Sequence, residues 1–294
     1  METPRLELDL LNTLVAIADL GGFAKAGARV GRTQSAVSLQ MQRLEELAGQ
    51  ALFARSGRSQ TLTEAGQTLV YYARRMLALS DEAVGVLGNA SLAGTVRLGT
   101  SQDMAEGWLP PVLGAFAKQF PAVRLECHVD RSAALVQAAR EGQLDVALTL
   151  HHGQHAGAEV LGELPLVWIG PGKGMPPTEG PLPLVMLNAP CEFRDRSLQA
   201  LDQAGIPWRI VFSSLSVSAL WAAIRAGLGV TVRTRVGLPP DLRVLARSKR
   251  FPGLPRTQVA LHADAATLST VGSRLYDMLA THLRKRLTAG VKTR

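Results

Sequence analysis

The stretch RTQSAVSLQMQRLEE, residues 32–46, has the spacing of a helix whose two long faces differ in chemistry. One face carries apolar side chains at helical intervals, which predicts a stripe packed into a core: Val37, Met41, Leu44 and Ala48. The other face carries neutral hydrogen-bonding side chains with one apolar residue among them: Gln34, Ser35, Ser38, Leu39 and Gln42. Thr33 is expected to cap the helix. A solvated face would usually carry Glu and Lys, so this one suggests recognition of another molecule.

The residues around this helix complete the pattern of a winged helix-turn-helix. A first helix is expected over residues 10–18, ending at Gly21-Gly22, and a second, short helix over 23–30. Gly31-Arg32 forms the turn before the quoted helix, and two short strands, 50–55 and 59–62, follow around a glycine-containing turn. The first sixty residues therefore predict a small helical domain with a β-hairpin wing.

This domain has the side chains needed to bind duplex DNA. Gln can pair with adenine, Ser can donate or accept a hydrogen bond, and an apolar side chain can contact a thymine methyl group. A recognition helix presents such groups near its N-terminus, so the base-reading candidates are Gln34, Ser35, Ser38, Leu39 and Gln42. The phosphate-binding candidates are Lys25, Arg29, Arg32, Arg43, Arg55 and Arg58. The competing interpretation is a solvated helix face whose arginines maintain solubility.

The charge of the whole chain gives only general support to this interpretation. The 294 residues carry a formal net charge of +8, which suits a polyanionic partner. Most of the excess lies after residue 242, whereas residues 21–75 are basic but flanked by acidic residues that cancel them. The net charge alone would therefore misplace a nucleic-acid site.

The residues from Thr63 to about Gly85 predict one long helix with a narrow apolar seam. The seam positions alternate in steps of four and three: Ala65, Leu69, Tyr72, Met76, Leu79, Ala83, Val86 and Ala90. This spacing predicts a coiled coil that pairs two subunits. The alternative is a helix that packs only on its own domain.

Beyond Gly94, strands and helices alternate, which predicts βαβ units and mostly parallel sheets. Strands are expected over residues 95–100, 122–129, 144–150, 182–187, 208–212, 230–233 and 259–262. Helices are expected over 108–119, 132–141, 195–204, 216–226 and 265–287. The Pro- and Gly-rich run 170–183 is expected to lead from one sheet to the next.

Polar residues at the ends of these strands are candidates for a ligand site. Ligands of open α/β sheets bind beyond the carboxyl ends of the strands, near helix N-termini. The candidates at such places are Thr100, Ser101, Gln102, Arg131, Thr149 and Thr231. Ser and Thr at strand ends are often simple helix caps, and that alternative stays open for each of them.

Other features argue against metal, redox and enzyme chemistry. His151, His152 and His155 lie in an apparent loop without a fixed helical spacing, so a metal site is not expected. Cys127 and Cys191 are expected to be small buried side chains in a reducing cytoplasm. Motifs such as GxSxG, HExxH and phosphate-binding glycine loops are missing, so neither catalysis nor a cofactor is expected. No apolar stretch approaches the ~20 residues that span a bilayer, and we expect a cytosolic protein without membrane contact.

The segment GGFAKAGARVGRTQSAVSLQMQRLEELAGQALFARSGRSQTLTEAG, residues 21–66, resembles the DNA-binding domain of LysR-type transcriptional regulators. A weaker α/β pattern extends this resemblance over the whole chain. Within the family, residues 32–46 together with GIPWR (205–209), AGLGVT (226–231) and PDLRVL (240–245) are similar to the LrhA/HexA-like branch. Members of that branch regulate motility, exoenzymes and related surface behaviours.

The resemblance implies a multidomain fold. It has a winged helix-turn-helix in residues 1–64, a linker and dimerisation helix in 65–93, and a two-lobed α/β effector domain like a periplasmic binding protein. Lobe one would comprise residues 94–163 and 266–294, and lobe two residues 164–265. The implied function is transcriptional regulation through duplex DNA, controlled by a small-molecule effector in the interlobe cleft. The implied protein partners are a second subunit through the linker helix, a homotetramer, and RNA polymerase.

Three residues depart from the family pattern. Leu39 stands where the family often has a basic residue, Ser35 replaces a usual Pro, and Gly27 replaces a usual Ala at an expected cost of about 0.5–1 kcal/mol. Two other functions compete with an effector-controlled regulator. One is a constitutive DNA-binding protein whose α/β part serves assembly only. The other is a solute-binding protein, against which the N-terminal ninety residues and the missing signal-peptide pattern count.

Overall fold

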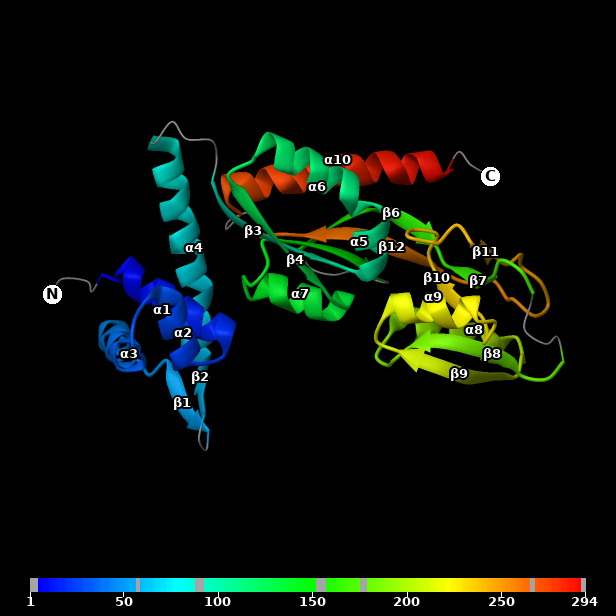
Figure 1. Cartoon of the computed structure of the whole chain (residues 1–294), viewed down its shortest axis with the longest axis horizontal. Coiled ribbons are helices and arrows are strands. Elements are labelled where there is room, and N and C mark those ends of the chain that lie inside the picture. The colour runs from blue at the N-terminus through cyan, green and yellow to red at the C-terminus, as the bar shows by residue number, and fades with distance from the viewer. Residues whose placement is uncertain are drawn as a thin grey trace.

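The computed structural model describes residues 5–56, 59–87, 93–151, 157–174, 179–264 and 268–291 (Figure 1). Three helices and a hairpin form an N-terminal head, one long helix follows, and two α/β lobes make up the rest. The predicted fold class, a winged helix-turn-helix followed by a two-lobed α/β domain, is confirmed. Among the described residues, no helix is both long enough and apolar enough to cross a membrane.

The head consists of α1 (Leu8–Leu20), α2 (Phe23–Val30), α3 (Gln34–Ala48) and the antiparallel wing strands β1 (Phe53–Ser56) and β2 (Ser59–Leu62). The predicted apolar stripe of α3 is confirmed, because Val37, Met41 and Leu44 are buried in the shared core. The expected cap is also present: the Thr33 hydroxyl oxygen accepts a hydrogen bond from the Ala36 amide at 3.2 Å. The helix-turn-helix therefore follows directly from helical periodicity and one capping residue.

Gly27 has a steric role that the sequence did not indicate. The turn between α2 and α3 is closed by the Arg32 amide, which donates to the Gly27 carbonyl oxygen at 2.8 Å. A Cβ atom at Gly27 would lie only 2.6 Å from the Arg32 carbonyl oxygen. The turn is therefore compatible with glycine and would have to shift for any larger residue.

The long helix α4 (Glu64–Leu87) packs along α1 through the buried side chains of Val70 and Ala73. The predicted seam lies beside this contact, and two of its large members remain exposed, Tyr72 at 49% and Leu79 at 67%. The side chain of Val86 and all of Ala90 lie outside the described part of the chain. The helix thus packs on its own domain and still presents an apolar face.

Lobe 1 contains a five-stranded sheet in the order β4-β3-β5-β12-β6. Its strands are β3 (Gly94–Thr100), β4 (Val123–Val129), β5 (Val146–His151), β6 (Ala158–Pro165) and β12 (Arg256–His262). Helices α6 (Leu109–Gln119) and α10 (Thr270–Val291) cover one face, and α7 (Ser132–Arg140) covers the other (Figure 1). The expectation of parallel pairing holds for β3 with β4 and β5, but β12 runs antiparallel to both β5 and β6 because the chain returns from lobe 2 to form it.

Lobe 2 is built from two small sheets, an antiparallel one in the order β10-β7-β11 and the parallel pair β8-β9. Its elements are β7 (Val167–Pro171), β8 (Leu182–Leu187), α8 (Glu192–Gln203), β9 (Trp208–Ser214), α9 (Val217–Arg225), β10 (Thr231–Arg233) and β11 (Leu242–Val244). Strands β6, β7 and β11 were not predicted, nor was the short helix α5 (Gln102–Gly107) that follows β3. Helix α10 begins at Thr270, and the expected residues 265–267 lie outside the described part.

Candidate DNA-binding surface and interlobe cleft

The face of α3 that points away from the core brings the base-reading candidates together. Gln34, Ser35 and Gln42 are exposed, Ser38 is partly exposed, and Leu39 is 66% exposed. The Ser35 and Thr33 hydroxyls lie 3.0 Å apart, which orders the start of the helix. Gln40 turns inward instead, where its amide oxygen accepts from the Thr13 hydroxyl at 3.0 Å. The exposed face therefore offers two amides, two hydroxyls and one apolar side chain.

Three of the proposed phosphate-binding arginines form ion pairs within the head. Arg43 lies 2.5 Å from a carboxylate oxygen of Glu7, Arg29 lies 3.6 Å from Asp19, and Arg32 lies 3.9 Å from Asp9. The Arg43 and Arg32 pairs are exposed, and exposed pairs contribute only about 0–1 kcal/mol, so a phosphate group can replace these two carboxylates at little cost. The partner of Arg29 is less exposed, because Asp19 is 23% exposed and also pairs with Arg74. Lys25 is exposed on α2.

The wing candidates can be placed only in part. Arg55 lies on β1, paired in register with Gln60 of β2. Arg58 lies outside the described residues. Glu45 ties the start of the wing to α3, because one of its carboxylate oxygens accepts from the Leu52 and Phe53 amides at 2.8 and 3.1 Å. Glu45 of α3 therefore fixes the position at which strand β1 of the wing begins.

A cleft of about 1030 Å³ lies between lobes 1 and 2. Its walls are largely apolar and include Val129, Val136, Leu187, Pro190, Phe193, Leu215 and Val217. Charged side chains also line it: Asp103, Asp130, Arg131, Glu192, Asp195, Arg196 and Arg233. A cleft of this size that combines apolar walls with polar groups is typical of small-molecule sites.

Only three of the six ligand-site candidates line this cleft: Ser101, Gln102 and Arg131. Thr100, Thr149 and Thr231 are fully buried and do not line it. The Thr149 hydroxyl instead lies 2.9 Å from Nε2 of His262, and the Thr100 hydroxyl donates to the Ser101 carbonyl oxygen at 3.4 Å. Thr100 ends β3, whereas Thr149 lies inside β5 and Thr231 begins β10. The side chains of all three are buried and do not line the cleft.

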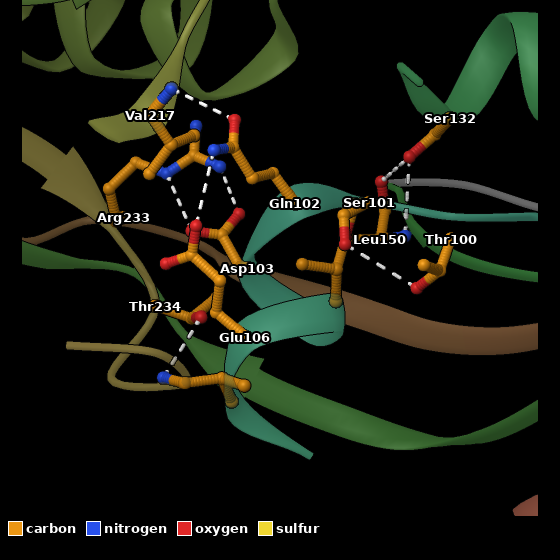
Figure 2. A network of polar contacts seen from close by, with 11 residues as sticks. Thr100, Ser101, Gln102, Asp103, Glu106, Ser132, Leu150, Val217, Arg233 and Thr234 are labelled. Carbon is orange, nitrogen blue, oxygen red and sulfur yellow. Dashed lines mark hydrogen bonds and ion pairs between the residues drawn. The ribbon is translucent and has the colours of Figure 1, made fainter. Parts of the chain in front are cut away.

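Both the oxygen and the nitrogen of the Gln102 side-chain amide form hydrogen bonds with other protein groups (Figure 2). Its oxygen accepts from the Val217 amide at 2.9 Å, which caps helix α9 of lobe 2. Its nitrogen donates to the Ser218 hydroxyl and to the Glu106 carboxylate, both at 3.2 Å. Gln102 therefore links the two lobes at the cleft.

A buried ion pair reinforces this link. Nε of Arg233 donates to Oδ1 of Asp103 at 3.0 Å, and Nη2 contacts the other carboxylate oxygen (Figure 2). Asp103 and Arg233 side chains are 1% and 7% exposed, and the guanidinium lies 5.0 Å from the Phe193 ring centroid. Burial alone would lower the pKa of Arg233, but the Asp103 carboxylate more than compensates and raises it. No periodicity or motif in the sequence indicates that these two residues pair.

Several further side chains shape the lobe 1 wall of the cleft. The Ser132 hydroxyl donates to the Leu150 carbonyl at 2.7 Å and accepts from the Leu150 amide at 3.2 Å, which fixes α7 on β5. The Ser101 hydroxyl oxygen is buried and has no hydrogen-bond partner among the described residues. Arg131 forms no ion pair within the described part of the chain. A hydroxyl and a guanidinium are thus available to a bound molecule.

The histidine and cysteine expectations need correction. His151 is not in a loop: it ends β5, is buried, and lies 5.7 Å from His262 between ring centroids. His152 and His155 lie outside the described residues. Cys127 is exposed on β4 rather than buried. Cys191 precedes α8 and lines the cleft, and the two thiols form no disulfide.

A DNA-reading head joined to a small-molecule cleft defines a class of protein, a ligand-responsive transcriptional regulator. Two family models match the chain: the bacterial regulatory helix-turn-helix protein of the lysR family over residues 8–67, and the LysR substrate binding domain over residues 89–284. The chain therefore belongs to the LysR family of DNA-binding transcriptional regulators.

Relatives of known name are regulators and not enzymes. The HTH-type transcriptional regulator PecT of Dickeya dadantii is 40% identical over 256 residues, which cover 87% of this chain and 81% of PecT. The regulator DgdR of Burkholderia cepacia is 35% identical over 279 residues, covering 95% of this chain and 94% of DgdR. The chain is accordingly a regulator rather than an enzyme.

Solved structures of full-length regulators share the fold. LysG of Corynebacterium glutamicum with bound effector Arg has a TM-score of 0.68 at 22% identity, with 95% of this chain and 99% of LysG covered. CbnR complexed with its target DNA has a TM-score of 0.58 at 19% identity, with 94% of this chain and 100% of CbnR covered. At these identities the likeness concerns the fold alone.

Proposed function

We propose that the exposed face of α3 reads base edges in the major groove, while the arginines around it bind phosphates. The observation that carries this proposal is the composition of the face, two amides and two hydroxyls without a lysine or glutamate among the first two turns. Glutamine and serine at these positions can pair with base edges. Arg43 and Arg32 flank the face in exposed pairs that a phosphate can replace.

The division of labour is testable with a duplex selected by the purified protein from a random library. Gln42→Ala and Ser38→Ala should relax base preference, whereas Arg55→Ala should weaken binding to every sequence and lower the salt slope by about one. Gln67→Ala, an equally exposed glutamine on α4, serves as the matched control and should change neither. A uniform loss from Gln42, Ser38 and Arg55 variants would refute the division.

We infer that the cleft binds a small-molecule effector that controls the DNA-binding heads. The cleft combines apolar walls with an unpartnered Ser101 hydroxyl and the Arg131 guanidinium, the mixture that orients an organic molecule. The LysG structure of the same fold holds an effector. Binding would favour one relative position of the lobes and thereby one arrangement of the heads.

Thermal unfolding in the presence of a metabolite library tests the effector site. A true effector stabilises the fold in a concentration-dependent manner, by about 2.7 kcal/mol at one hundred times its Kd. Arg131→Gln should abolish that shift, while Arg140→Gln, at the far end of the same helix, should preserve it. A compound-independent melting temperature together with unchanged DNA binding would instead support the constitutive alternative.

We also propose that α4 pairs two subunits and that two such pairs form a tetramer. The exposed Tyr72 and Leu79 provide the apolar face for the pairing. Leu79→Asp should shift the protein toward monomer in sedimentation velocity, whereas Leu228→Asp, an exposed leucine of lobe 2, should not. Equal sedimentation of all three proteins would contradict this assignment.

The remaining proposals concern organisation and biological role. We propose functional units of residues 1–64, 65–93, 94–163 with 266–294, and 164–265, acting in the cytoplasm and contacting RNA polymerase. The segments 205–209, 226–231 and 240–245 support membership of the LrhA/HexA-like branch and hence control of motility or other surface behaviours. Genome-wide mapping of bound DNA tests the role, because targets unrelated to surface behaviours would contradict it.

A further inference from the structure

A contact between the linker helix and lobe 1 joins the two functional halves of the same subunit. The Tyr71 hydroxyl of α4 donates to Oδ2 of Asp264, just after β12, at 2.6 Å. Gly142, in the turn after α7, leaves room for the same tyrosine: a Cβ atom there would lie 3.2 Å from Cδ2 of Tyr71 and 3.8 Å from Cδ of Arg74. Figure 1 shows α4 standing between the head helices and lobe 1.

Arg74 extends this contact to the head. Its guanidinium lies 2.6 Å from a carboxylate oxygen of Asp19 on α1, and its side chain is only 7% exposed. Burial lowers the pKa of Arg74, while Asp19 and, from lobe 1, Asp145 oppose that shift. Asp145 is itself fixed by the Arg97 amide, which donates to its carboxylate at 2.6 Å. The arginine therefore sits at a point where α1, α4 and the sheet of lobe 1 meet.

The lobe 1 side of this contact is connected rigidly to the cleft. Helix α7 begins at Ser132, which lines the cleft with Arg131, and its far end leads into Gly142 beneath Tyr71. Strand β5 runs beside it and ends at His151 on the cleft wall. The Ser132 hydroxyl holds the two elements together. Helix α7, nine residues and about 14 Å long, therefore connects the cleft wall to the Gly142 turn.

We propose that Tyr71 and Arg74 are positioning residues: they hold the DNA-binding head in a set orientation on lobe 1, and α7 transmits the state of the cleft to them. The inference rests on the proposed function, since it assumes that the head binds DNA and that the cleft receives an effector. It adds the route of regulation within one subunit. Head orientation determines how far apart the half-sites of a bound duplex must lie.

The test uses the full chain and pulsed electron resonance between spin labels at Glu46→Cys on α3 and Lys118→Cys on α6, with Cys127 and Cys191 replaced by serine. Labelled chains are diluted with unlabelled ones, so only distances within a subunit are measured. Tyr71→Phe removes one hydroxyl and should raise the undocked fraction about tenfold, the equivalent of about 1.4 kcal/mol. Tyr276→Phe, which removes a hydroxyl that donates to the Glu159 carboxylate within lobe 1, is the matched control and should keep the parent distribution.

A second readout connects the contact with DNA. The parent and Tyr276→Phe proteins should discriminate between duplexes whose half-sites are spaced differently, and Tyr71→Phe should bind them with more nearly equal affinity. The inference is overturned if the Tyr71→Phe distance distribution superimposes on that of the parent, or if it broadens without any change in spacing preference. Failure of the parent protein to select any duplex would refute the proposed function instead, and the distance measurement would still decide whether the contact exists.

Discussion

Loss of the buried Asp103 carboxylate should destabilise the two-lobed domain severely. Asp103→Ala would leave the Arg233 guanidinium buried, 7% exposed and without its counter-ion, while Phe193 still covers one of its faces. Removing one partner of a buried ion pair costs about 3–5 kcal/mol. For a domain of this size, that loss corresponds to a fall in Tm of about 10 °C.

The assay can report on the lobes alone. All four tryptophans, Trp108, Trp168, Trp208 and Trp221, lie beyond residue 93, so their fluorescence during urea unfolding follows the α/β domain and not the head. Asp241→Ala provides the matched control. Asp241 also binds an arginine through both oxygens, Arg225 at 2.6 and 2.9 Å, but that pair is on the surface, so its loss should leave the transition in place.

A double variant separates the effect of removing the ion pair from the effect of leaving one buried charge without a partner. Asp103→Leu combined with Arg233→Met removes both charges, and replacement of a whole buried pair by apolar residues is often neutral or stabilising. The double variant should therefore be more stable than Asp103→Ala by about 2 kcal/mol or more. This expectation is wrong if Asp103→Ala lowers the free energy of unfolding no more than Asp241→Ala does. It is also wrong if the double variant is less stable than Asp103→Ala.

Three other outcomes follow from the same structure. Leu39→Ala should weaken binding to the selected duplex about fivefold, which equals about 1 kcal/mol of apolar contact. Replacing the contacted thymine by uracil removes the methyl group, so it should weaken binding of the parent equally and leave binding of the variant unchanged. Fluorescence anisotropy measures both affinities. Gly27→Ala should destabilise the head by about 1–3 kcal/mol in chemical denaturation, because its Cβ would meet the Arg32 carbonyl, whereas Gly114→Ala in open space on α6 should stabilise slightly. Ser132→Ala should lower the free energy of unfolding by about 1–3 kcal/mol, because both Leu150 backbone groups lose a hydrogen-bond partner. Ser132→Thr keeps the hydroxyl and should retain most of that stability, and tryptophan fluorescence during unfolding measures both variants.

The head could be predicted because its information is local. The core-facing residues of α3 recur every three or four positions, and the capping residue Thr33 directly precedes the helix. The short strands β7 and β11 have no such local pattern. They contain five and three residues, and their pairing joins Ile169 to Val244, which are far apart in the chain. A strand that short is defined by its partners rather than by its own pattern.

Only three of the six predicted ligand-site residues line the cleft: Ser101, Gln102 and Arg131. Successive side chains of a strand point to opposite faces, so an error of one position exchanges a buried residue for an exposed one. Thr100 is buried, while the next residue, Ser101, lines the cleft. The pairing of Asp103 with Arg233 spans 130 positions of sequence and leaves no periodic signal. Strand ends locate such a site, but the orientation of each side chain depends on a register that only the folded sheet fixes.

Solvent exposure separates the roles of chemically identical arginines in this chain. Arg43 and its partner Glu7 are 63% and 50% exposed, so water already screens the pair and a phosphate can take the place of the carboxylate. Arg74 and Arg233 are each 7% exposed, and neither can exchange its carboxylate without leaving a charge in the interior. The first kind of arginine is therefore suited to reversible DNA binding, and the second to holding parts of the protein in fixed positions. A count of basic residues treats the two kinds alike and therefore does not identify the arginines suited to DNA.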